Sequence, residues 1–149
     1  MDPILRRLDA IQWTYSDGDP NALAELARRI SAVGRTRDDF IVYTDLVNGV
    51  TFQLPNVNDG RPFEIEEWTD LNRAIIGCFL GNIAAQTYRE GRFFASALVI
   101  GVVANQPGEG FWSLAQQVGL LRANSEDARL QLWFEHVRIA RQWYASRPG

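Results

Sequence analysis

The sequence contains no lysine, so all 15 of its basic residues are arginine. This absence excludes the lysine of a Walker phosphate-binding loop and Schiff-base catalysis through a lysine amine. The single cysteine, Cys78, excludes an internal disulfide and a metal site built from several cysteines of one chain. The single histidine, His136, excludes an imidazole-rich metal site, and we expect neither a metal nor a cofactor.

Long apolar runs are missing as well. The longest two, Ala74 to Gly81 and Phe93 to Ala104, fall short of the roughly 18 residues that cross a bilayer. Near the start of the sequence, Arg6 and Arg7 stand where the apolar part of a secretory signal would run. We therefore expect a cytoplasmic protein without a membrane partner.

The composition is that of a globular protein. With 149 residues, 46% of them hydrophobic, the chain can bury one core. We predict a single domain over residues 1–149, with an N-terminal helical pair over 1–35 and an α+β core over 36–149. The net charge of −3 favours a protein partner over nucleic acid, which stays an alternative because a local basic face is enough to bind it.

The N-terminal region carries two similar helix-start signals, Asp2-Pro3 and Asp19-Pro20. Apolar residues at helical spacing follow the first signal as far as Tyr15, and they follow the second as far as Gly34. We therefore predict two amphipathic helices joined by a turn at residues 16–18.

The middle of the chain predicts a short strand at Phe40 to Tyr43, a helical turn over 44–47 and a loop over 55–62. A long helix should begin between Glu64 and Asp70 and end at Gly91. Its centre is apolar on nearly every side, which indicates burial. Gly77 and Gly81 lie one turn apart on one face, and we expect another backbone to approach them closely.

The C-terminal part predicts a buried strand at Phe93 to Ala104, a turn, a helix closed by Gly119, and a last helix capped by Ser125. The fold class is thus α+β and mostly helical, with a winged-helix-like core around a long buried helix and a small sheet. The last helix should bury one stripe of side chains: Leu130, Trp133, Phe134, Val137, Ala140 and Tyr144.

Catalytic candidates are few. Cys78 falls in the most apolar turn of the long helix, where we expect a buried structural thiol. His136 falls beside the apolar stripe of the last helix, so we expect a partly exposed ring. Glu66 and Glu67 with His136 are the residues on which a small hydrolase or transferase with a carboxylate base would depend.

The arginines are the remaining candidates for binding a partner, because guanidinium groups bind both carboxylates and phosphates. Most are interleaved with acids. Four flank predicted loops beside few acids, and we predict that they contact a partner: Arg89, Arg92, Arg35 and Arg37.

Several short motifs between Phe40 and the C-terminus resemble a pattern found in small uncharacterised bacterial proteins. They are VYTDL (Val42 to Leu46), FLGNI (Phe79 to Ile83), SALVI (Ser96 to Ile100), PGEGF (Pro107 to Phe111) and the terminal LWFEHVRIARQWY. The same order is similar, more distantly, to the winged-helix part of alkyltransferase-like proteins.

The second resemblance implies that Thr44 to Val47 form a supporting helix and that Asn72 and Arg73 meet DNA, so Arg73 is a fifth arginine predicted to contact a partner. Cys78 lacks the following His and Arg of the repair enzymes' reactive tetrapeptide, which excludes repair chemistry. We therefore predict a non-enzymatic binding module with a protein or nucleic-acid partner, acting as a regulator or an immunity or antitoxin-like protein. The five tryptophans leave room for an exposed aromatic patch that pairs subunits, so a homo-oligomer is one expected partner state.

Overall fold

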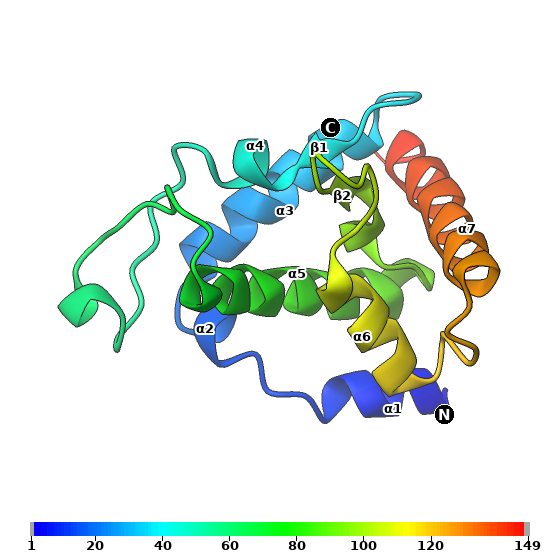
Figure 1. Ribbon diagram of the computed structural model, residues 1–149, viewed down its shortest axis with the longest axis horizontal. Helices are drawn as coiled ribbons and strands as arrows, with labels where there is room; N and C mark the ends of the chain where they lie inside the picture. Colours follow the sequence, from blue (N-terminus) through cyan, green and yellow to red (C-terminus); the bar gives the residue numbers. More distant parts are fainter. Residues whose placement is uncertain (1, 148–149) are drawn as a thin grey trace.

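The computed structural model describes residues 2–147 and is 62% helical, with one small parallel sheet (Figure 1). The α+β, mostly helical class is confirmed, while the winged-helix character of the core stays a prediction. The longest helix, α5 (Asp70–Gly91), crosses the centre of the molecule, and the other helices pack around it. Within the described residues no helix is long and apolar enough to span a membrane.

Three helices form the N-terminal region: α1 (Pro3–Asp9), α2 (Thr14–Asp17) and α3 (Pro20–Gly34). Both predicted start signals are confirmed, because the Asp2 carboxylate accepts from the Ile4 amide at 2.8 Å and that of Asp19 accepts from the Ala22 amide at 3.1 Å. The first predicted helix is wrong beyond Asp9, where residues 10–13 leave the helical path.

Trp13 explains this break. Its indole ring lies against the backbone of α5 at Gly81, where a Cβ atom would overlap the ring. The expectation that another backbone approaches Gly77 and Gly81 closely is therefore wrong. A side chain rather than a backbone covers Gly81, and no atom outside its own helix lies within 4 Å of a Cβ placed on Gly77.

The sheet joins β1 (Ile41–Val42) to β2 (Val99–Ile100) in parallel, with Ile41 opposite Val99 and Val42 opposite Ile100. The short helix α4 (Tyr43–Val47) follows β1 directly, close to the predicted turn. The strand predicted at 93–104 is mostly wrong. Residues Ala95–Leu98 form the 3-10 helix η2, and only the two residues opposite β1 have a strand to pair with.

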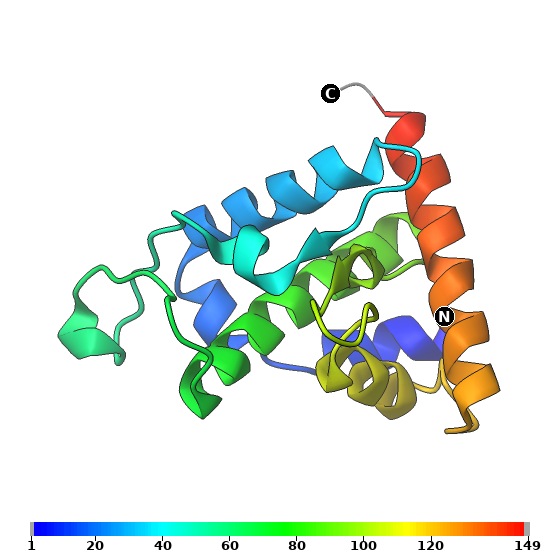
Figure 2. The ribbon, with the colours of Figure 1, turned by 45° about the horizontal axis from the view of Figure 1, so that its top comes forward.

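A loop projects from one end of the molecule between α4 and α5 (Figures 1 and 2). It contains the 3-10 turn η1 (Asn58–Gly60), and Phe52 and Phe63 close its base by exchanging backbone hydrogen bonds of 2.8 and 2.9 Å. At its end the Thr69 hydroxyl accepts from the Asn72 amide and caps α5 inside the predicted window.

The C-terminal part contains α6 (Glu109–Val118) and α7 (Glu126–Ala145), which begin and end near the predicted positions. Gly119 ends α6 in the left-handed conformation, and Ser125 caps α7. One residue of the predicted α7 stripe is wrong, and one residue expected beside the stripe is buried. Phe134 is 59% exposed, and His136 is buried in its place at 3% exposure.

Helix α5 contributes to two apolar clusters and therefore has no polar face along its middle. Ile75, Phe79 and Ile83 pack with α3, α4 and the 50–54 segment. Ala85 and Tyr88, nearer its C-terminal end, pack with α1, α6 and the first half of α7. The two clusters leave only the N-terminal half of α5 partly uncovered, on the side that faces α6.

Candidate binding cleft

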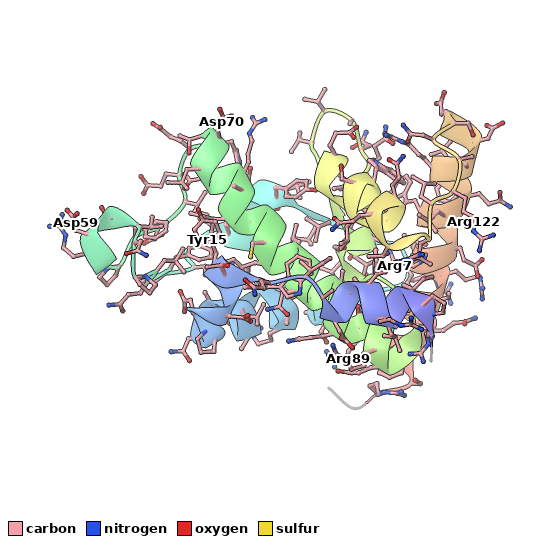
Figure 3. The ribbon with its side chains drawn as sticks, turned by 90° about the horizontal axis from the view of Figure 1, so that it is seen from below. Arg7, Tyr15, Asp59, Asp70, Arg89 and Arg122 are labelled. Atoms are coloured by element: carbon pink, nitrogen blue, oxygen red, sulfur yellow. The ribbon has the colours of Figure 1, made fainter. Side chains whose placement is uncertain are left out.

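A cleft of about 890 Å³ lies between the N-terminal half of α5 and helix α6. Figure 3 views these two helices from below, with Asp70 and Arg89 marking the two ends of α5. The side chains that line the cleft are mostly apolar and come from segments spread along the chain. They include Ile11, Trp13, Tyr43, Trp68, Ile76, Leu80, Val102, Val103, Phe111 and Leu114.

The floor of the cleft contains a row of three α5 residues, Arg73, Gly77 and Gly81. They are spaced by four residues, about one helical turn or roughly 6 Å per step, so they follow one another on the same face. Trp13 covers Gly81, whereas the backbone at Gly77 is open to the cleft. Of the two glycines on the floor, Gly81 is therefore covered by a side chain and Gly77 is not.

One end of the cleft is held by a chain of contacts that links four segments. The Gly108 amide donates to the Tyr43 hydroxyl at 2.9 Å, and the rings of Tyr43 and Trp68 meet edge to face with centroids 6.2 Å apart. Arg73 completes the chain, because its Nε donates to the Trp68 carbonyl at 3.1 Å. Burial raises the pKa of Tyr43, so its hydroxyl stays neutral at physiological pH.

Helix α6 forms the opposite wall. Its first residues include Gly110, where a Cβ atom would again meet nothing within 4 Å. Glu109 also lines the cleft, but its carboxylate pairs with Arg129 at 3.1 Å. In the turn before α6, the Gly108 amide donates to the Tyr43 hydroxyl and is therefore not available to a bound anion.

The rim carries exposed apolar side chains. Residues 101–106 form a turn in which the Gly101 amide donates to the Gln106 carbonyl at 3.0 Å. Val102 and Val103 lie at the tip of this turn, with exposed fractions of 66% and 97%. Apolar surface therefore continues from the cleft onto the outside of the molecule.

Of the five arginines predicted to contact a partner, Arg73 is the one that lines the cleft. No carboxylate of residues 2–147 pairs with it. Arg89 and Arg92 lie near the other end of α5, about 24 Å or more away along the helix. Both face α1, where Arg89 pairs with Asp9 at 2.6 Å and Arg92 with Asp2 at 3.4 Å.

Arg35 and Arg37 lie in the turn after α3. Arg141 of α7 holds this turn, because its guanidinium donates to the carbonyls of Thr36 and Asp39 at 3.2 and 2.6 Å. Arg73 thus lies at the opposite end of α5 from Arg89 and Arg92, and Arg35 and Arg37 belong to a turn of another segment.

The structure also separates the residues named for an enzyme. Glu66 and Glu67 are exposed just before α5, and His136 lies in α7 at the other side of the molecule (Figures 1 and 2). The expectation of a partly exposed His136 is wrong: its Nδ1 accepts from the Phe94 amide at 2.8 Å, and burial lowers its pKa to about 4. Throughout the described chain no group of three or more acids, histidines or cysteines could hold a metal ion.

Cys78 is only half-buried, so the expectation of a buried thiol is wrong. Its sulfur lies 3.7 Å from the hydroxyl of Ser16 in α2. Asn82, one turn further along α5, donates to the Ser16 hydroxyl at 2.9 Å and to the Asp17 carboxylate at 3.2 Å. This polar cluster attaches α2 to α5 and does not line the cleft.

Comparison with protein-family models, with curated proteins and with solved structures finds no match for this chain. The site is therefore interpreted from its geometry. Sequence reasoning did not single out Tyr43, Trp13 or Trp68, which lie far apart in the sequence. The paired glycines at 77 and 81 and the prediction that Arg73 contacts a partner both pointed to this part of α5.

Proposed function

We propose that this chain is a non-enzymatic binding module that docks an apolar segment of a protein partner in the cleft between α5 and α6. The cleft itself is the observation that carries the proposal. Its volume of about 890 Å³ and its mostly apolar lining, with a few polar groups at one end, fit a binding pocket. Such a module would act as a regulator or as an immunity or antitoxin-like protein.

Two observations favour a protein over nucleic acid as the partner. The exposed valines at the rim, Val102 and Val103, extend the apolar surface beyond the cleft, and only a large partner would cover both regions. The net charge is −3, and two of the candidate arginines, Arg89 and Arg92, are paired with acids. Duplex DNA needs a continuous basic surface.

Gly77 offers a direct test because a side chain placed there would enter the cleft without meeting other atoms. A displayed peptide library is selected on the wild-type protein and counter-selected on the Gly77→Trp variant, whose indole enters the cleft and takes up the space over the α5 backbone. The matched control is Gly77→Ala, which adds one methyl group at the same position. Circular dichroism establishes that both variants keep the helical content of the wild type.

We expect peptides with apolar anchor residues that bind the wild type and Gly77→Ala but lose at least tenfold in affinity for Gly77→Trp. If every selected peptide binds all three proteins equally, or if no peptide is enriched, docking in the cleft is contradicted. The protein could instead bind duplex DNA at low salt, with an affinity that falls steeply as salt rises and is the same for Gly77→Trp. That result would show that the partner is nucleic acid and not a protein.

A further inference from the structure

We infer that the segment docked in the cleft carries an aromatic ring, which lies over Gly77, and an adjacent carboxylate, which pairs with Arg73. This inference rests on the proposed function, since it specifies the chemistry of the partner that the cleft receives. It follows from a comparison of Gly81 and Gly77, two glycines one turn apart on α5 whose surroundings differ.

Gly81 shows how this face of α5 accepts a ring. The indole of Trp13 lies directly on its backbone, with the ring atom Cη2 2.6 Å from the place where a Cβ atom would be. Gly77 precedes it by one turn, points into the same cleft and has no covering group. A second planar ring can therefore lie on the helix backbone at Gly77 as Trp13 does at Gly81.

The surroundings of Gly77 favour an aromatic group over an aliphatic one. Trp13, Trp68 and Phe111 all line the same space and come from three different segments. Aromatic rings that meet edge to face or offset gain about 0.5–1.5 kcal/mol beyond the burial of their area. An aliphatic side chain of similar size gains the burial but lacks this additional contact.

Arg73 supplies the charge complementarity. Its Nε is bonded to the Trp68 carbonyl, while its two terminal nitrogens have no hydrogen-bond partner within residues 2–147. A guanidinium held in this way presents its donors to a carboxylate. Arg73 precedes Gly77 by one turn, about 6 Å, which is within the reach of two neighbouring side chains of a peptide. The nearby Glu109 is already paired with Arg129.

The experiment uses the full chain, labelled with ¹⁵N, and four capped dipeptides followed by NMR titration. The probes are acetyl-Trp-Glu-amide, the reversed acetyl-Glu-Trp-amide, acetyl-Trp-Gln-amide without the charge, and acetyl-cyclohexylalanyl-Glu-amide without the aromatic ring. We expect the better of the two Trp/Glu probes to shift the amide signals of Gly77 and its neighbours and to bind tightest. Loss of the charge or of the ring should weaken binding about two- to fivefold each.

The Arg73→Gln variant should abolish the difference between the Glu and Gln probes, whereas Arg138→Gln, on the exposed side of α7, should preserve it. If all four probes bind at Gly77 with equal affinity, the aromatic and acidic preference is wrong while the docking cleft stands. If no probe shifts the cleft signals and the library also yields no peptide sensitive to Gly77→Trp, both the inference and the proposed function are wrong.

Discussion

The indole ring of Trp13 occupies the space that any side chain on Gly81 would need. This contact draws residues 10–13 out of the helical path of α1 and places them along α5. It also forms one wall of the cleft, so the same contact that fixes the N-terminal segment shapes the candidate site.

Gly81 and Gly77 should respond in opposite ways to the same substitution. Gly81→Ala forces Trp13 out of its place, and we expect a loss of about 1–3 kcal/mol in the free energy of unfolding. Gly77→Ala meets open space in the middle of a helix and should stabilise by up to about 1 kcal/mol. Urea unfolding measures both changes. Equal effects at the two positions would contradict the contact between Trp13 and Gly81.

Tyr43 should stabilise the start of α6 through its hydroxyl. Tyr43→Phe leaves the amide of Gly108 without its partner, and we expect a loss of about 1–2 kcal/mol in the free energy of unfolding. The control is Tyr88→Phe, since the Tyr88 hydroxyl lies 3.4 Å from the Asp2 carboxylate, a long and weak hydrogen bond. Thermal unfolding of both variants should show a clear decrease for Tyr43→Phe alone.

Arg29 should matter more than its neighbour Arg28, although both pair with Glu25. The Arg29 guanidinium also donates to three carbonyls at the end of α4, the closest being that of Asn48 at 2.6 Å. We expect Arg29→Gln to destabilise by about 1–3 kcal/mol, whereas Arg28→Gln removes only an exposed ion pair and should change the stability little. Chemical unfolding tests the difference, and equal losses would show that α4 does not depend on Arg29.

His136 should make the stability fall in mild acid. Burial lowers its pKa to about 4 from an ordinary value of 6.5, so between these values the unfolded chain binds a proton that the folded protein does not. Stability is therefore greatest above pH 6.5, and its loss as the pH falls to about 4 amounts to about 3 kcal/mol from this residue.

The controls for His136 separate charge from hydrogen bonding. His136→Asn keeps an acceptor for the Phe94 amide and removes the titrating ring, so stability should depend less on pH between 4 and 6.5. His136→Leu leaves that buried amide unpaired and should destabilise at every pH by about 1–3 kcal/mol. An unchanged pH dependence in the Asn variant would assign the acid sensitivity to other groups.

Local sequence signals predicted the helix boundaries well. Asp2, Asp19 and Ser125 each cap a helix as expected, and Gly119 ends α6. These signals succeed because a cap is a hydrogen bond between residues close in the sequence. The long helix α5 begins at Asp70 and ends at Gly91, within the limits predicted for it.

The errors fall where distant segments decide the outcome. Residues 93–99 are buried as predicted, but residues 95–98 form η2 because β1 offers only two residues for pairing. His136 is buried because the Phe94 amide, far away in the sequence, needs an acceptor. Of the five candidate arginines only Arg73 lines the cleft, and the sequence could not distinguish it before Trp68 and Tyr43 were placed beside it.

The row of Arg73, Gly77 and Gly81 also sets a direction. Residues four apart on an α-helix lie on a line inclined by about 26° to the helix axis. The open strip on the floor of the cleft therefore runs obliquely across α5. A segment that follows this strip from Arg73 toward Trp13 crosses the helix at that angle instead of lying parallel to it.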